Sequence, residues 1–349
     1  MNKQLYFFFL SAVLTVVGCG GGDPFSGLTP EPTPAPDPGP PPPVPTDNLS
    51  TTPPSGMIGR IVYLGAVDNQ FGSVHLFITS PDGSNPTGLF DLSDPFSYSG
   101  PSWGPTGNKL MIASNLQGSA EWDIYSVSTD GTGIEHVVAG PSNGDFAPSW
   151  SPDGSQVVFQ SLTDATNGVD IYHYNIGTQA LTNLTNSPGN EELPSWSPDG
   201  TRVLFQSTQD GGTNLWLMNP DGTGLTALTT DVGIQNSAGV FSPDGQTIAF
   251  ESTKHQPVTA TVTIGDFEIW AMDADGSNPR RLSIGVGESD AARFPSWSPD
   301  GKHIAYEFHD FTLHQLFSVT FIGVMNADGS NMYLLPNQPI DGRFPRWGP

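Results

Sequence analysis

The sequence contains very little cysteine and very few basic residues. One cysteine in 349 residues makes an intramolecular disulfide impossible. Lys and Arg number 11 against 35 Asp and Glu, and the formal net charge is −24. A chain of this charge repels phosphate backbones, which argues against nucleic acid as a partner. Cationic peptides, cationic protein surfaces and divalent metals are the partners that it would attract.

The apolar run near the N-terminus is too short to span a bilayer comfortably. It extends from Leu5 to Val17, about 13 residues, which is typical of a signal-peptide core. The following "VVGC" (16–19) resembles a bacterial lipobox, in which the Cys thiol is acylated and becomes the new N-terminus. We therefore predict a lipoprotein signal peptide over 1–18 and lipid attachment at Cys19; a simple signal peptide before a chance cysteine is the alternative. By resemblance to bacterial lipoproteins, Gly20 favours the outer membrane.

Proline dominates the next segment, as in "TPEPTPAPDPGPPPPVPT" (29–46). This stretch has no apolar pattern, and its prolines favour an extended polyproline II conformation. We predict that 19–55 comprise the lipidated cysteine and a disordered linker that holds the folded part away from a membrane. The folded domain is then expected over 56–349.

One phrase recurs through this domain. "PSWSPDG" stands at 148–154, 194–200 and 295–301, with looser copies at 101–107 and 239–245. Each copy precedes an apolar run, a polar gap, a second apolar run and a second Asp-Gly turn, which reads as four short strands. A four-stranded unit repeated every 40–50 residues predicts a β-propeller. The column that starts each unit has six members: Trp103, Trp150, Trp196, Phe241, Trp297 and Trp347.

The two ends of the domain each hold part of one unit. Residues 60–90 lack the Trp strand, and the terminal "PRWGP" (345–349) has that strand and nothing after it. We therefore predict an all-β, six-bladed ring in which the C-terminal strand completes the N-terminal blade. Closure of this kind removes exposed sheet edges.

The repeat resembles the TolB-type propeller family, whose WD-like units carry "WSPDG", "IAF" and "MDADG" in this order. "WSPDGKHIAY" (297–306) and "EIWAMDADGSNPRRLS" (268–283) carry the resemblance, and it recurs along about 290 residues. The resemblance implies the fold. It implies function only weakly, because one fold hosts many functions.

Departures from the repeat indicate where a partner would bind. The longest insertions, "TKHQPVTATVTIGD" (253–266) and "FHDFTLHQLF" (308–317), fall on the face opposite the uniform turns. The linkers on that face end beside the expected channel, at Ser99, Asp145, Glu191, Glu192, Ser237, Arg293 and Arg343. We predict that acidic and basic side chains bind a partner there: Asp145, Glu191, Glu192, Arg293 and Arg343. Ordinary solvated loop charge is the alternative.

Three other patterns favour structural roles. The Asp273, Asp275 and Asn278 spacing resembles the start of a calcium loop but lacks the distal Glu, so a hairpin turn is the preferred interpretation. The set His303, Glu307, His309 and His314 has no counterpart in other units, so we predict no metal site there. The Trp column offers sugar-stacking surfaces, but one Trp in nearly every unit is better explained as core between blades.

No catalytic constellation is evident: there is no G-x-S-x-G motif, and lipidation would consume the single thiol. We therefore predict a non-enzymatic, monomeric, lipid-anchored propeller of the bacterial cell envelope, facing the periplasm or the cell surface, that binds an envelope protein or peptide without a cofactor. Two alternatives stay open: a carbohydrate-binding or carbohydrate-active propeller, and a calcium-dependent adhesin.

Overall fold

The computed structural model describes residues 49–66, 74–90, 98–115, 121–138, 140–141, 144–162, 168–187, 189–254, 267–283, 291–310, 319–336 and 340–349. The predicted signal peptide, Cys19 and most of the Pro-rich linker lie outside these ranges. Within them, no helix has the length and apolar character needed to cross a membrane.

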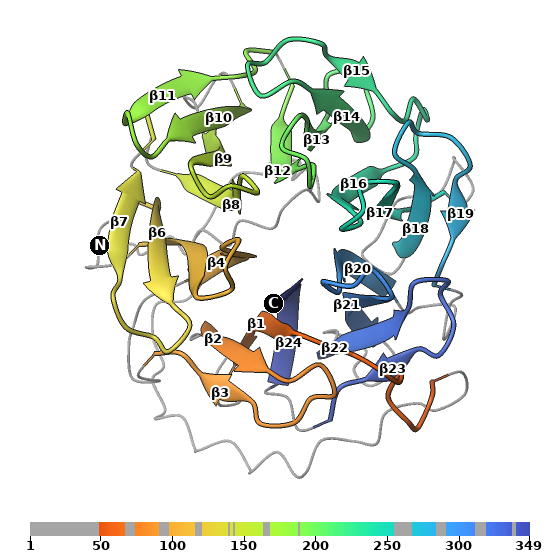
Figure 1. Ribbon diagram of the computed structural model, residues 1–349. Helices are drawn as coiled ribbons and strands as arrows, with labels where there is room; N and C mark the ends of the chain where they lie inside the picture. The colour runs from red at the N-terminus through yellow and green to blue at the C-terminus, as the bar shows by residue number, and fades with distance from the viewer. Residues whose placement is uncertain are drawn as a thin grey trace, which may run out of the picture. The chain divides into compact units, whose positions relative to one another are not determined.

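The described chain forms six four-stranded antiparallel sheets arranged as a ring (Figure 1). Blade one is β24-β1-β2-β3, and blades two to six follow in chain order as β4–β7, β8–β11, β12–β15, β16–β19 and β20–β23. This confirms the predicted all-β, six-bladed propeller.

Each blade runs from an inner strand beside the axis to an outer strand at the rim. The inner strands are β4 (Tyr98–Trp103), β8 (Asp145–Trp150), β12 (Glu191–Trp196), β16 (Asn236–Phe241), β20 (Ala291–Trp297) and β24 (Ile340–Gly348). The second strands are β1 (Arg60–Ala66), β5 (Lys109–Ser114), β9 (Gln156–Leu162), β13 (Val203–Ser207), β17 (Thr247–Ser252) and β21 (His303–Asp310). The third strands are β2 (Val74–Thr79), β6 (Asp123–Ser128), β10 (Val169–Asn175), β14 (Asn214–Met218), β18 (Glu268–Asp273) and β22 (Val319–Asn326). The outer strands are β3 (Thr87–Gly88), β7 (Glu135–Val138), β11 (Ala180–Asn183), β15 (Thr226–Ala227), β19 (Arg280–Arg281) and β23 (Tyr333–Leu334).

The C-terminal strand closes the ring as predicted. β24 pairs with β1, with Trp347 opposite Ile61 and Arg346 opposite Val62. The turn of blade one is formed by two segments far apart in the sequence, and Arg60 Nε donates to Pro349 O across it at 3.3 Å. In this position Gly59 lies against Pro299 of blade six, and Pro349 lies against Gly107 of blade two. The other "SPDG" turns make the same proline–glycine contact: Pro105–Gly154, Pro152–Gly200, Pro198–Gly245 and Pro243–Gly301.

The hydrophobic core lies between blades rather than within one. Trp196 packs with Val158 and Ile171 of the preceding blade, and Trp347 packs with Ala305 and Ile322 of blade six. The same arrangement holds for the remaining members of the column, Trp103, Trp150, Phe241 and Trp297, each of which packs against a cluster containing residues of the preceding blade. Burial of these aromatic faces fixes each blade against its neighbour.

The ordered domain includes part of the segment that the sequence analysis assigns to the linker. Ser50 N donates to Met332 O of blade six at 2.6 Å, and Leu49 packs against the apolar cluster around Trp297. Pro54 is buried. Described residues before the predicted boundary at residue 56, among them Leu49 and Ser50, therefore contact the propeller.

Candidate functional site

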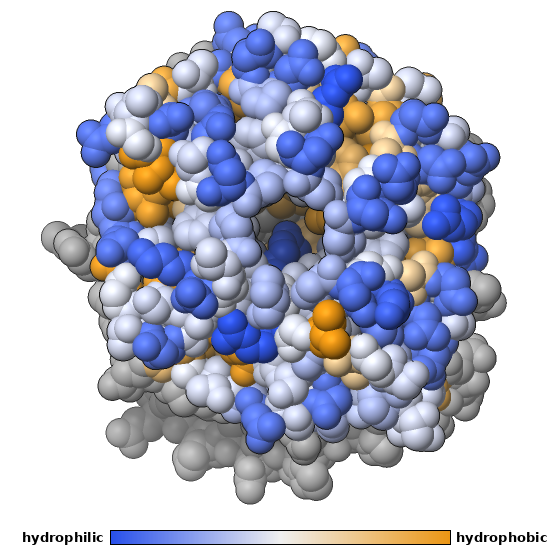
Figure 2. Space-filling view, viewed as in Figure 1, coloured by the Kyte–Doolittle hydropathy of each residue, from blue (hydrophilic) through white to orange (hydrophobic). Residues whose placement is uncertain are grey.

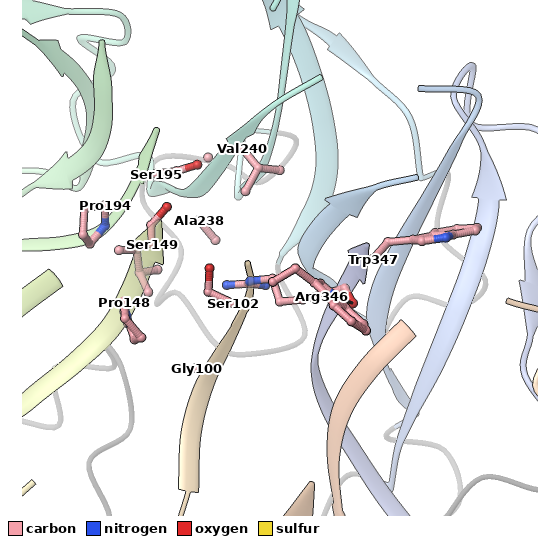
Figure 3. A pocket seen from close by; sticks show the side chains of 14 residues that line it. Gly100, Ser102, Pro148, Ser149, Pro194, Ser195, Ala238, Val240, Arg346 and Trp347 are labelled. Atoms are coloured by element: carbon pink, nitrogen blue, oxygen red, sulfur yellow. Dashed lines mark hydrogen bonds between the residues drawn. The ribbon is translucent and has the colours of Figure 1, made fainter. Parts of the chain in front are cut away.

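A cavity of about 190 Å³ lies on the axis of the ring, where the space-filling surface is hollowed (Figure 2). Its walls come from the inner strands of blades one to five: Gly100, Ser102 and Trp103; Ala147, Pro148 and Ser149; Leu193, Pro194 and Ser195; Ala238, Gly239 and Val240; and Arg346 with Trp347. Most of the lining is therefore small or hydroxyl-bearing. Arg346 is its one charged residue among the described residues (Figure 3).

A backbone bulge shapes each inner strand next to the channel. The pairing register shifts just before the lining serine or its counterpart, for example between Phe146 and Ser149 and between Glu192 and Ser195. One residue in each bulge has a positive φ: Gly100 (55°), Ala147 (48°), Leu193 (53°), Ala238 (50°), Phe294 (50°) and Phe344 (49°). Five of these six are not glycine, although the left-handed region is costly for them. The bulge turns the next residues toward the channel.

Side chains of the preceding blade bind the N–H groups of four bulges. Gln160 Oε1 accepts from Leu193 N at 2.9 Å, and Gln206 Oε1 accepts from Ala238 N at 3.2 Å. In the next two blades a carboxylate takes the place of the amide. Glu251 Oε2 accepts from Phe294 N at 3.1 Å, and Glu307 Oε2 accepts from Phe344 N at 2.9 Å. We call these four side chains, Gln160, Gln206, Glu251 and Glu307, the bulge acceptors. At the same register position, blade two has Ala113 and blade one has Leu64, and neither side chain can accept a hydrogen bond.

The carboxylate acceptors have basic side chains as partners. Arg293 Nη2 donates to Glu251 Oε1 at 2.7 Å and Arg293 Nε to Glu251 Oε2 at 3.1 Å, and both residues are buried. His309 Nε2 lies 2.6 Å from Glu307 Oε1. Burial alone would raise the pKa of Glu307, but His309, the bond from Phe344 N–H and the charge of Arg293 together hold it below its usual value. Each carboxylate therefore lies beside a basic side chain.

The predicted acidic partner-binding residues are engaged within the fold. Asp145 is buried and accepts from Gly140 N. Glu191 Oε1 accepts from Ser187 Oγ at 2.6 Å and from Ser207 Oγ at 2.8 Å. Glu192 Oε2 accepts from Gln206 Nε2 at 2.8 Å. None is the solvated loop charge that the alternative interpretation required.

Among the described residues, no Lys, Arg or His side chain forms an ion pair with these buried acids. Burial is the largest cause that raises the pKa of Asp145, to about 6, and hydrogen bonds from Ser161 and Gly140 oppose it only in part. Burial likewise raises the pKa of Glu191 and of Glu192.

The predicted arginines differ from each other. Arg293 is 7% exposed and is occupied by Glu251, with its guanidinium 4.3 Å from the centre of the Phe267 ring. The Arg343 side chain is 36% exposed and pairs with Asp341 at 2.7 Å. The five predicted residues thus all have partners within the fold, and none of them is among the residues that line the cavity. Ser237, at another linker end, donates through Oγ to Glu251 Oε1 at 2.7 Å.

The weaker sequence candidates also have places in the structure. Asp275 accepts from the N–H and hydroxyl of Ser277, and Asn278 Nδ2 donates to Asp273 Oδ2 at 2.6 Å, so this loop is a closed hairpin turn. His303 stacks on Trp347 with ring centres 5.9 Å apart. Among the described residues, no three His, Cys, Asp or Glu side chains form a group that could hold a metal. His314, 255–266 and 311–317 of the variable loops lie outside the described residues.

Sequence reasoning missed the lining of the channel. It placed the binding residues at the linker ends and treated "PSW" only as the start of a turn. The serine of the "PSW" motif lines the cavity in three blades, and the last repeat of the motif reads "PRW", with Arg346 in place of the serine. The substitution of Arg for Ser in one repeat was the available signal.

Six four-stranded sheets in a closed ring around a polar axial channel define the protein as a six-bladed β-propeller with a candidate ligand site at its centre. Residues 51–349 match the family described as TolB beta propeller domain. Because this match covers most of the chain, the protein belongs to the TolB beta propeller family.

Individual relatives agree with this assignment. The Tol-Pal system protein TolB of Zymomonas mobilis is 34% identical over 89 residues, which are 26% of this chain and 17% of that protein. The aligned segment thus spans less than a fifth of the relative. The crystal structure of TolB from Acinetobacter baumannii has a TM-score of 0.67 at 24% identity and covers 84% of this chain and 69% of its own.

Propellers with other activities share the fold. Oligogalacturonate lyase from Vibrio parahaemolyticus has a TM-score of 0.51 at 14% identity, over 78% of this chain and 74% of the lyase. Structural likeness at these identities shows the fold alone.

Proposed function

We propose that the protein is a non-enzymatic binding protein of the bacterial cell envelope and that a peptide segment of another envelope protein enters its axial channel. The observation that carries this proposal is the cavity itself: inner strands of five blades converge on a space of about 190 Å³ lined by serine hydroxyls and one arginine. Rigid rings with a polar axial opening present converging donors without rearrangement, which lowers the entropic cost of binding. The family match and the Tol-Pal relative support an envelope role.

The channel supplies recognition rather than chemistry in this proposal. Its described lining residues include no carboxylate, so no acid/base pair of the kind that cleaves glycosidic bonds is assigned to it. Shape and hydrogen bonding to a segment of extended chain are the expected sources of affinity.

The test uses the full chain as bait in a detergent extract of the envelope, with captured proteins identified by mass spectrometry. Ser195→Trp fills the channel, because Ser195 lines the cavity. Thr182→Trp is the matched control, because Thr182 is exposed on the outer strand β11. We expect a partner that binds the native chain and the control and is lost with the filled channel. A partner captured equally by all three baits would contradict channel binding.

We further propose that Cys19 is acylated and anchors the protein to the outer membrane. The lipobox-like "VVGC" and the Pro-rich spacer after it support this proposal. Cys19→Ser is expected to move the protein from the membrane fraction to the soluble fraction and to abolish labelling by radioactive palmitate. Retention of the variant in the membrane fraction would argue against the anchor.

A further inference from the structure

Arg346 interrupts an otherwise uncharged column inside the channel. Strand register places it at the same position as Ser102, Ser149, Ser195, Val240 and Ser296 of the other inner strands. Figure 3 shows its side chain reaching toward Ser102, with Ser149 and Ser195 on the opposite wall. One blade thus places a cation where the other five place a hydroxyl or a methyl group.

The guanidinium of Arg346 has unused donors. It carries five N–H groups, and its one hydrogen bond among the described residues runs from Nη1 to Pro345 O at 3.0 Å. The side chain is partly exposed to the cavity. Burial lowers its pKa to about 10, so it remains a cation at neutral pH.

The nearest carboxylates are already occupied. Glu307 and Glu251 act on Arg346 through space, but neither forms an ion pair with it. Glu251 accepts two bonds from Arg293, and Glu307 is held by His309 and by Phe344 N–H. The guanidinium therefore faces the cavity with most of its hydrogen-bonding capacity free.

Serine hydroxyls complete a set of donors around the same space. Ser102 and Ser195 make no hydrogen bond through their hydroxyls to any described residue, and Ser149 Oγ only accepts a long bond, 3.4 Å from Trp196 N. Each hydroxyl can therefore donate to a ligand in the cavity. A planar guanidinium flanked by hydroxyl donors matches the two oxygens of a carboxylate.

We propose that the channel binds a carboxylate group of a peptide, with Arg346 as its cationic donor and Ser102, Ser149 and Ser195 as hydroxyl donors. This inference rests on the proposed function and specifies its ligand. A single carboxylate suits the site better than a phosphate, because a chain of net charge −24 repels a dianion more strongly. The same arginine repels Ca²⁺ from the axis, so the channel is a site for anions rather than for metals.

Three N-acetylated tripeptides test the proposal. Acetyl-Ala-Ala-Ala with a free carboxylate, its C-terminal amide, and acetyl-Ala-Asp-Ala amide are titrated against the full chain. Binding is followed by nitrogen-15 NMR of the indole N–H groups of Trp103 and Trp347, since Trp103 Nε1 donates to Arg346 O at 2.8 Å. We expect the acids to shift these signals and the neutral amide to have no effect. The stronger of the two acids identifies a chain terminus or an acidic side chain as the bound group.

Arg346→Ser restores the residue of four other blades and is therefore expected to fold. It should weaken binding of the acids about tenfold or more, as expected for loss of a charge-assisted bidentate pair. Arg346→Lys should retain part of the affinity. Arg202→Ser, which removes an exposed arginine next to an "SPDG" turn, is the matched control and should bind like the native chain.

Two results would overturn the inference: equal binding of the acid and amide peptides, or unchanged binding by Arg346→Ser. Its failure is distinguishable from failure of the proposed function. If Arg346→Ser still captures the envelope partner as the native chain does, the function stands and the carboxylate inference is wrong. If no partner is captured but the acids bind through Arg346, the carboxylate site stands and the proposed function is wrong.

Discussion

Blades three and four and blades five and six all bury acidic side chains near the channel, but they surround them differently. In the first pair of blades, Asp145 and Glu192 have hydrogen-bond donors but no ion-pair partner among the described residues, and burial raises the pKa of each. In the second pair, the basic side chains of Arg293 and His309 lie beside Glu251 and Glu307, and the pKa of Glu307 is lowered although Glu307 is buried. Burial thus favours the neutral form of the acids in blades three and four, which we call the neutral arc, whereas Glu307 is held toward its ionised form in blades five and six, which we call the charged arc.

The two arcs also differ in what occupies the bulge-acceptor position. An amide, as in Gln160 and Gln206, binds a backbone N–H without charge. A carboxylate at that position binds the same group, but its burial requires a cation nearby. In blades five and six, the basic side chains of Arg293 and His309 lie beside these carboxylates. The charged arc therefore depends on its pairs, whereas the neutral arc does not.

The largest expected effect comes from breaking the buried pair. Glu251→Ala leaves the buried Arg293 guanidinium without a counter-charge and Phe294 N–H without an acceptor, so the free energy of unfolding should fall by about 3–5 kcal/mol. Urea unfolding at pH 7, followed by far-ultraviolet circular dichroism, measures this loss. The double variant Glu251→Gln with Arg293→Ser removes both charges and should recover a large part of it. If the double variant loses as much stability as Glu251→Ala, the unpaired charge of Arg293 is not the source of the loss.

The neutral arc should respond to pH with the opposite sign. The folded pKa of Asp145 is about 6, above its ordinary value of 3.8, so the native state binds more protons than the unfolded state between these pH values. Stability from this group is complete below about pH 4 and is lost as pH rises through 6, at a cost of about 2–3 kcal/mol. Asp145→Asn should therefore raise the free energy of unfolding at pH 7 and flatten its fall between pH 4 and pH 7.

An exposed aspartate provides the matched control for this titration. Hydrogen bonds from Ser151 and Ser155 lower the pKa of Asp153 to about 2, so its contribution is present above pH 4 and is lost as pH falls. Asp153→Asn should destabilise the protein at pH 7 and leave the slope between pH 4 and pH 7 unchanged. If Asp145→Asn behaves in the same way, Asp145 is not the group that titrates.

The fold was predictable from the sequence because its determinants are local and repeated. The Trp column, the "SPDG" turns and the split first unit together identified six blades and their closure, since each depends on residues within one repeat. The bulge acceptors were not predictable in this way. Whether Gln160 reaches Leu193 N depends on how two blades pack and on a positive φ, and neither leaves a pattern within a single strand.

The candidate site shows the same division. The charges at the linker ends were visible in the sequence, but burial and internal partners of Asp145, Glu191 and Arg293 depend on three-dimensional packing. Arg346 was visible too, as the one arginine in the column of channel residues. Recognising it required knowledge that this column faces the axis, because a strand alternates sides and a bulge reverses the alternation.

An amide acceptor should contribute less than the charged pair. Gln206→Ala removes the acceptor for Ala238 N–H and the donor to Glu192, leaving buried polar groups unpaired, which costs about 1–3 kcal/mol. Gln246→Ala, at an exposed turn position, is the matched control and should change stability by less than about 0.5 kcal/mol. Both are measured by urea unfolding at pH 7. A loss as large as that of Glu251→Ala would show that charge does not separate the two arcs.

The smallest effect concerns the backbone that both arcs share. Ala147 has a φ of 48° at a bulge position where blade two has Gly100, with a φ of 55°. Ala147→Gly relieves about 1–2 kcal/mol of left-handed strain but gives the unfolded chain more freedom, so we expect a net stabilisation below about 1 kcal/mol. The reverse change, Gly100→Ala, adds this strain and brings a Cβ within 3.2 Å of Ala147 Cα, so it should destabilise. Because these bulges recur in every blade regardless of charge, an effect of Ala147→Gly that depends on pH would contradict the separation of backbone strain from the electrostatics of the two arcs.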